Sequence, residues 1–116
     1  MNKRSFSYLR AYRRRWSLSE EELARLLGAA DGSLVCRFET GGRIPRAKVL
    51  LGCEVIFGVT ARELFPGLYE QVEDAIMRRA ARLHETLDGK TDKRSMQKRE
   101  LLDDMMKRAT GNARCS

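Results

Sequence analysis

Residues 19–45 read SEEELARLLGAADGSLVCRFETGGRIP, and this stretch carries the clearest helix start and stop signals of the chain. Ser19 followed three residues later by Glu22 forms a capping-box pattern, which predicts a helix that begins after Ser19. Acidic residues fill the first turn, where negative charge suits the helix dipole. The leucines that follow fall on one helical face, and Gly28 is suited to a left-handed helix end. The pattern therefore predicts a short amphipathic helix that stops at Gly28.

A second helix is expected after Asp31, whose carboxylate can cap the first turn. Its apolar residues form a stripe, which leaves the outer face to Gly32, Ser33, Cys36 and Arg37. The glycines after Thr40 break the helix, and Pro45 requires an extended residue before it. A helix, a tight turn and a second helix in this order are typical of a helix-turn-helix, which would place residues 31–39 in the major groove of DNA.

The sequence on either side of this stretch predicts three more helices. Residues 7–16 form the first, residues 46–57 have the apolar spacing of a core helix, and residues 60–65 form a short last one. We therefore expect an all-α domain of five helices in residues 7–66.

Residues 8–66 resemble the Cro and phage-repressor-like (XRE) family of helix-turn-helix domains. The resemblance is carried by Leu23-Ala24, Gly28, the Arg37-Phe38-Glu39-x-Gly41 box, Pro45, and Gly58-Val59 followed by Glu63-Leu64-Phe65. Two departures are visible: the family often has glutamine where Glu20 stands, and the segment from Gly28 to Glu39 is one residue longer than in its commonest version. The resemblance implies a Cro/repressor-like fold and a transcriptional regulator of a kind common in bacteria and their phages.

The resemblance also implies an ion pair within the domain. In this family, the arginine at the position of Arg13 pairs with the glutamate at the position of Glu39, and the pair fixes the recognition helix. A carboxylate inside a phosphate-facing protein needs such a cationic partner. The alternative is an ordinary surface pair, which would contribute about 0–1 kcal/mol.

The basic charge of the chain is concentrated at its N-terminal edge. The formal net charge is +7, and residues 1–18 contain six of the 23 basic side chains but none of the 16 acidic ones. A basic edge beside a near-neutral body suits a surface that faces a polyanion such as DNA. Residues 1–6 are expected to form a flexible basic arm. The alternative is a basic leader that only faces solvent.

The expected DNA contacts fall into two groups. The residues expected at base edges are Arg37, Ser33, Gly32 and Cys36. Those expected at phosphates are Arg43, Arg46, Lys48, Ser19, Arg10 and Arg14. Arg37 is the first candidate because a guanidinium can bind guanine with two hydrogen bonds. The alternative for Arg37 is a phosphate contact or a salt bridge to Asp31 or Glu21.

Residues 67–116 follow a different pattern. Apolar residues recur every three or four positions over residues 67–87 and again after a turn at residues 88–90, which predicts a C-terminal helical hairpin or a pair of dimerisation helices. The residues expected at a dimer or partner interface are Leu68, Val72, Ile76, Leu83, Leu87, Leu102, Met105 and Met106. Two alternatives stay open: these side chains cover the core of their own chain, or they bind another protein, such as a toxin that the chain neutralises.

Several classes of function find no support in the residues. Cys36, Cys53 and Cys115 have no metal-ligand spacing and the one histidine, His84, lies far from any cysteine pair, so we expect no metal site and no cofactor. No Ser/His/Asp set and no phosphate-binding loop is present, so an enzyme is not expected. No apolar run approaches the ~20 residues of a membrane span and no signal peptide is visible, which favours reduced thiols and a cytoplasmic location.

The sequence thus predicts a sequence-specific transcriptional regulator that binds double-stranded DNA. The expected form is a homodimeric repressor that occupies an inverted-repeat operator and is nucleoid-associated when bound. The alternative is an antitoxin or co-regulator whose C-terminal helices bind a partner protein.

Overall fold

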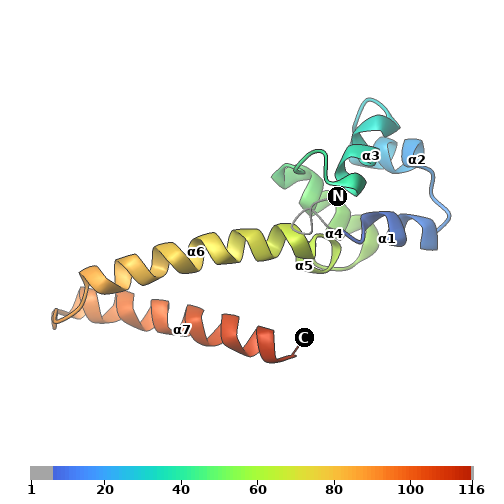
Figure 1. The fold of residues 1–116 in the computed structure, drawn as a ribbon. Helices are drawn as coiled ribbons and strands as arrows, with labels where there is room; N and C mark the ends of the chain where they lie inside the picture. Colours follow the sequence, from blue (N-terminus) through green and yellow to red (C-terminus); the bar gives the residue numbers. More distant parts are fainter. Residues whose placement is uncertain (1–6, 116) are drawn as a thin grey trace. The chain divides into compact units, whose positions relative to one another are not determined.

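The computed structural model describes residues 7–115, with side chains as far as residue 111. This range contains seven helices and no strand, so the predicted all-α class is confirmed (Figure 1). The helices are α1 (Leu9–Arg15), α2 (Glu20–Leu27), α3 (Gly32–Thr40), α4 (Ala47–Phe57), α5 (Ala61–Leu64), α6 (Pro66–Thr86) and α7 (Lys93–Cys115). The flexible basic arm expected for residues 1–6 lies outside the described residues.

The helices form two compact units, which divide between Gln71 and Val72. The sequence pattern places the boundary earlier, at residue 67, and the difference has a physical reason. Leu68, in the first turn of α6, packs against the hydrophobic core of the first unit. The start of α6 therefore belongs to the first unit, and only its later turns belong to the second.

The first unit has one hydrophobic core, to which each of its five short helices contributes. The fully buried side chains are Leu9 of α1, Leu23 of α2, Val35 of α3, Cys53 of α4 and Leu64 of α5. Burial raises the pKa of the Cys53 thiol to about 11, so this thiol stays protonated and acts as a small apolar side chain. A core assembled from all five helices holds each of them in a defined place.

Glycines end three of these helices in the left-handed conformation. Gly28 ends α2 with φ 76°, Gly41 ends α3 with φ 81°, and Gly58 ends α4 with φ 69°. A Cβ atom is strained at such φ values, which is why glycine is favoured at these positions. The helix ends expected at Gly28 and after Thr40 are therefore confirmed.

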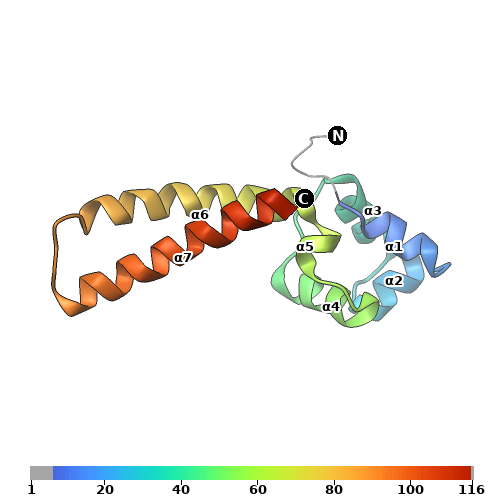
Figure 2. The same cartoon turned by 90° about the horizontal axis from the view of Figure 1, so that it is seen from below.

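In the second unit α6 and α7 run antiparallel, joined by a turn that contains Gly89 (Figure 2). Asp92 caps α7, because its carboxylate accepts a hydrogen bond of 3.1 Å from the Ser95 N–H. Hydrogen bonding from Ser95 also lowers the pKa of Asp92. With 21 and 23 residues these are the longest helices, but within the described range no helix is both long and apolar enough to cross a membrane.

The residues buried between α6 and α7 are few. Ala80, Leu87 and Leu102 form this small core, and Met105 packs against it. We predicted an interface with another chain for Leu87 and Leu102, but the structure buries both within the α6–α7 pair. The prediction is therefore wrong for these two residues, because the antiparallel partner helix already covers them. Leu68 and Met105 also pack within their own chain but are only partly buried, so their place at an interface stays a prediction.

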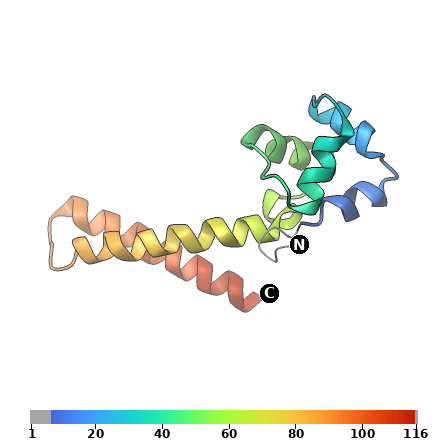
Figure 3. The same cartoon turned by 45° about the horizontal axis from the view of Figure 1, so that its top comes forward.

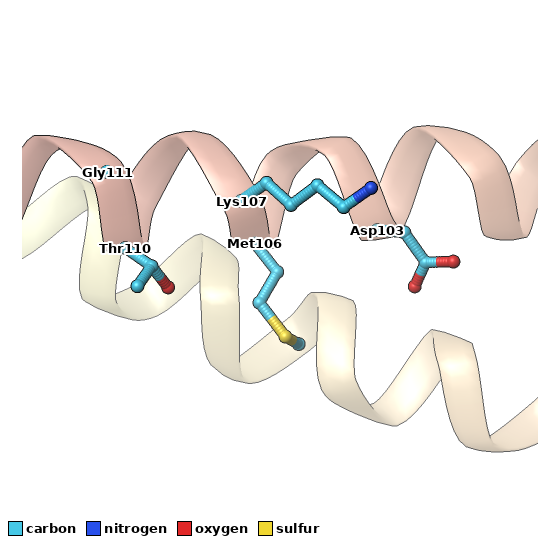
Figure 4. A pocket seen from close by; sticks show the side chains of 5 residues that line it. All are labelled: Asp103, Met106, Lys107, Thr110 and Gly111. Atoms are coloured by element: carbon cyan, nitrogen blue, oxygen red, sulfur yellow. The ribbon is translucent and has the colours of Figure 1, made fainter.

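The other four residues expected at an interface remain partly open to solvent. Val72, Ile76, Leu83 and Met106 are 43–52% exposed. Figure 4 shows Met106 pointing from α7 toward α6, beside a shallow hollow that Asp103, Lys107, Thr110 and Gly111 also line. These four apolar side chains are available to a partner.

Candidate nucleic-acid interface

A turn joins α2 to α3 (Figure 3). Local hydrogen bonds cap the start of each of these two helices. The predicted capping box is present: the Glu22 N–H donates to Ser19 Oγ (3.0 Å), and the Ser19 N–H donates to Glu22 Oε1 (2.8 Å). At the start of α3, Asp31 Oδ1 accepts hydrogen bonds from the Ser33 N–H (2.9 Å) and hydroxyl (2.5 Å). The backbone hydrogen bond from Ser19 lowers the pKa of Glu22, and the hydroxyl of Ser33 lowers that of Asp31. Ionised carboxylates therefore cap both helices.

Gly32, the first residue of α3, is buried against α2. Its N–H donates to Glu21 Oε1 at 3.0 Å. A Cβ atom on Gly32 would lie 2.8 Å from that oxygen and 3.1 Å from the backbone carbonyl carbon of Glu20. The base contact expected for Gly32 is therefore wrong, because this glycine is buried and lets α2 approach α3.

The Glu39 carboxylate near the end of α3 is buried against α1. Arg13 donates from Nε to Glu39 Oε2 (2.6 Å) and from Nη2 to Oε1 (3.1 Å), and from Nη1 to the Leu18 carbonyl (2.9 Å). Arg13 is 8% exposed and Glu39 is 5% exposed, which excludes the alternative of an ordinary surface pair. The hydrogen bond to Glu39 raises the pKa of Arg13. Because a two-point pair allows one relative orientation of its partners, it fixes α3 against α1.

Arg10 is a second arginine at the same carboxylate. Its Nε donates to Glu39 Oε1 at 3.1 Å, and its side chain is 43% exposed. Glu39 thus binds the Nε of Arg10, and the phosphate contact expected for Arg10 stays a prediction for the rest of its guanidinium. Arg14 is exposed in the same helix and is the other candidate phosphate ligand of α1.

The outer face of α3 presents three exposed polar side chains: Ser33, Arg37 and Thr40. Within the described part of the chain, Arg37 makes no ion pair with either carboxylate considered as its partner. Cys36 is half-buried, and its carbonyl accepts a hydrogen bond of 3.0 Å from Thr40 Oγ1. Thr40 was not predicted on this face, because in the sequence it stands next to the glycines that end the helix. Its spacing of three residues from Arg37 was the signal that places it on this face.

Exposed cations continue from α3 into the next helix. Arg43 and Arg46 lie in the loop, and Lys48 lies in the first turn of α4. The Arg43 N–H donates to the Arg37 carbonyl at 3.3 Å, which ties the loop to α3. Arg46 is the N-cap residue of α4, and its side chain makes no capping hydrogen bond. The candidate phosphate ligands Arg43, Arg46 and Lys48 are therefore all exposed in the segment that follows α3.

The start of α2 is acidic, unlike the basic segment that follows α3. Glu20, Glu21 and Glu22 fill its first turn, and the Ser19 N–H already donates to the Glu22 carboxylate. A phosphate approaching this helix end would meet carboxylates before it met backbone N–H groups. The phosphate contact expected for Ser19 is therefore disfavoured, and the cationic part of the surface lies toward the α3–α4 loop.

These groups form a hydrogen-bonding surface of guanidinium, ammonium and hydroxyl groups. Among the described residues, no three His, Cys, Asp or Glu side chains gather in a way that could hold a metal ion. Guanidinium and hydroxyl groups bind phosphates and base edges by hydrogen bonds. No protein-family model, curated protein or solved structure matches the chain.

Proposed function

We propose that residues 7–66 form a Cro/repressor-like helix-turn-helix domain, with α3 as its recognition helix, followed by a C-terminal helical hairpin. The observation that carries this proposal is the buried Arg13–Glu39 pair, which holds α3 while Arg37 on its outer face stays exposed and makes no ion pair with another described residue. A recognition helix needs a rigid buried side and a polar, cationic outer side. Both requirements are met by the same helix.

The proposed function is sequence-specific binding of double-stranded DNA in the control of transcription. Arg37 would donate two hydrogen bonds to O6 and N7 of a guanine, and Ser33 would contact a neighbouring base edge. Arg43, Arg46 and Lys48 would bind phosphates, which sets the register of the helix but carries no sequence information. The chain would act in the cytoplasm as a repressor by occupying a promoter, without catalysis, metal or cofactor.

Two copies would bind an inverted repeat. Arg37 is the one long polar side chain on the outer face of α3, so a single half-site would supply modest discrimination. Two half-sites about one DNA turn (~34 Å) apart would combine the discrimination of each, and the deformability of the DNA between them would add to it. We therefore propose a homodimer as the DNA-bound form.

The test is selection from a random double-stranded DNA library by full-length protein of measured oligomeric mass. We expect an inverted repeat with a guanine in each half-site, retained by a dimer. Affinity should fall by ~0.9 log unit per log unit of salt for each phosphate neutralised. If well-folded protein retains DNA without enriching any sequence, the proposal of sequence-specific regulation fails.

A second candidate function is that of an antitoxin or co-regulator whose C-terminal helices bind a protein. The observation in its favour is the set of exposed apolar side chains on α6 and α7, such as Leu83 at 47% and Leu101 at 57%. A complex of fixed stoichiometry, in which the amides of α6 and α7 gain protection from hydrogen exchange, would favour this function.

A further inference from the structure

The pair of α6 and α7 exposes more large apolar side chains than it buries. Its buried core consists of Ala80, Leu87 and Leu102. The exposed side chains include Val72 (48%), Ile76 (43%) and Leu83 (47%) of α6 and Leu101 (57%) of α7. An apolar helical stripe is normally covered by another element, so the arrangement of these four residues indicates what covers it.

Helical spacing places the four residues on one face of the pair. The spacing of an α-helix places Val72, Ile76 and Leu83 on the same side of α6. This side lies next to the buried residues Ala80 and Leu87. On α7, Leu101 adjoins the buried Leu102. The two apolar stripes therefore border the buried core of the pair.

An ion pair marks the opposite face. His84 Nε2 of α6 lies 3.3 Å from Asp103 Oδ1 of α7. On α6, Leu83 and His84 lie on opposite sides of the buried residues Ala80 and Leu87. On α7, Leu101 and Asp103 lie on opposite sides of the buried Leu102. Because His84 and Asp103 meet on one face of the α6–α7 pair, Leu83 and Leu101 are exposed together on the other face.

The charged side chains interleaved with these apolar residues are mostly basic. Arg79 lies between Ile76 and Leu83 on the α6 stripe, and Lys98 lies one turn before Leu101 on the α7 stripe. Arg94 and Arg108 lie further along the same side of α7. Asp104, one turn after Leu101, is the acidic residue nearest to this stripe, so basic residues outnumber acidic ones along it. We define the basic apolar face as Val72, Ile76, Arg79, Leu83, Lys98 and Leu101.

We propose that the basic apolar face binds an amphipathic helix of a second protein, with an apolar stripe flanked by Asp or Glu. The apolar stripe of the partner would cover Leu83 and Leu101 together with Val72 and Ile76. The acidic flanks would lie beside Arg79 and Lys98, where opposite charge fixes orientation and excludes other partners. The occupant is therefore a third helix that completes the pair.

A second copy of the chain suits this face poorly. A two-fold interface brings a surface against itself, so the basic side chains of one copy would approach those of the other. Like charges placed close together across an interface oppose association. The charge pattern thus separates this face from any surface that joins two copies on DNA.

The experiment uses two synthetic fluorescein-labelled helical peptides of about 20 residues, with the same leucine stripe but with either Glu or Lys on its flanks. Their binding to the full-length chain is measured by fluorescence anisotropy at several salt concentrations. We expect the Glu peptide to bind roughly tenfold more tightly, with a preference that fades as salt rises. The double variant Arg79→Glu/Lys98→Glu should reverse the preference toward the Lys peptide.

The matched control is Arg78→Glu/Lys107→Glu, which makes the same charge change on exposed residues outside the face. It should leave the preference for the Glu peptide unchanged, and circular dichroism should show equal helix content in both double variants. Equal binding of the two peptides, or equal effects of the two double variants, would overturn the proposal.

Two other results would also overturn it by assigning the face to a different occupant. One is self-association that Leu83→Asp abolishes and that the Glu peptide does not compete away. The other is binding to phosphatidylglycerol vesicles without binding to either peptide. Selection from the DNA library tests the α3 surface separately, so failure of DNA binding and failure of this proposal are distinguishable.

Discussion

The two units of this chain bury apolar surface in different ways. In the first unit five short helices each contribute a fully buried side chain, and a buried ion pair joins α1 to α3. In the second unit two long helices share a core of three buried residues and leave Leu83 and Leu101 about half exposed. The first unit therefore has the contacts to define one geometry by itself, whereas the second is a surface that a partner would complete.

The largest expected effect concerns the ion pair of the first unit. Glu39→Ala leaves the Arg13 guanidinium buried without its partner, which should cost about 3–5 kcal/mol of unfolding free energy. Urea denaturation followed by the fluorescence of Trp16, the single tryptophan, measures this for the first unit. The exposed Glu85→Ala in α6 serves as the control and should change stability by less than about 0.5 kcal/mol. A loss below about 1 kcal/mol for Glu39→Ala would mean that the pair contributes no more than a surface pair.

A pair of core truncations compares the two units directly. Leu23→Ala should cost about 3–5 kcal/mol because Leu23 is fully buried, and Leu102→Ala should cost about 2 kcal/mol because its small core can collapse more easily. Trp16 fluorescence and far-UV circular dichroism are recorded together during denaturation. Leu23→Ala should lower the denaturant midpoint of the Trp16 fluorescence transition. Leu102→Ala should leave that midpoint unchanged and lower only the midpoint of the part of the dichroism signal that comes from α6 and α7. Coincident shifts in both variants would show that the two units unfold as one.

The close approach of α2 to α3 can be tested at Gly32. Gly32→Ala should cost about 1–3 kcal/mol, because the new Cβ would lie 2.8 Å from Glu21 Oε1 and 3.1 Å from the backbone of Glu20. Gly42→Ala is the matched control, since its Cβ would meet nothing closer than 3.7 Å. Denaturation monitored at Trp16 measures both. Equal stability of the two variants would rule out a packing role for Gly32.

On DNA, the expected effects separate the two kinds of contact. Arg37→Ala should cost about 1–3 kcal/mol on the selected operator and relax the preference at one base pair. Arg43→Ala should weaken binding to operator and to random DNA by equal factors. It should also reduce the slope of log affinity against log salt by ~0.9, the contribution of one phosphate contact. Competition binding with both DNAs measures these effects. An equal loss on both DNAs for Arg37→Ala would reassign it to a phosphate.

The smallest expected effect is a pH dependence at the start of α3. Hydrogen bonds from Ser33 lower the pKa of Asp31 below its ordinary value of 3.8, so the ionised cap stabilises the fold above that pH. This contribution should disappear as the pH falls through the lower pKa of the folded state. Asp31→Asn keeps a capping oxygen that does not titrate. Its urea midpoint should therefore fall less than that of the natural chain between about pH 5 and about pH 2, and an equal fall would exclude Asp31 as the cause.

Features that depend on neighbours in the sequence were predictable. The capping box of Ser19 and Glu22 and the end of α2 at Gly28 were read from residue types a few positions apart. Arg13 and Glu39 are 26 positions apart, and only the family resemblance implied that they meet. The second partner of Glu39, Arg10, went unpredicted because nothing local distinguishes it from the exposed Arg14.

The sequence by itself determined the all-α class, the ends of the short helices and the amphipathic character of residues 67–116. Each of these follows from backbone conformation and side-chain spacing within a few residues, which any stretch of chain carries with it. Only the tertiary structure decided that Gly32 faces α2 rather than solvent, that Arg10 turns to Glu39, and that Leu87 lies inside the α6–α7 pair while Leu83 lies outside. The physical reason is that burial and pairing depend on which helix lies opposite, and the spacing of residues along one helix does not contain that information.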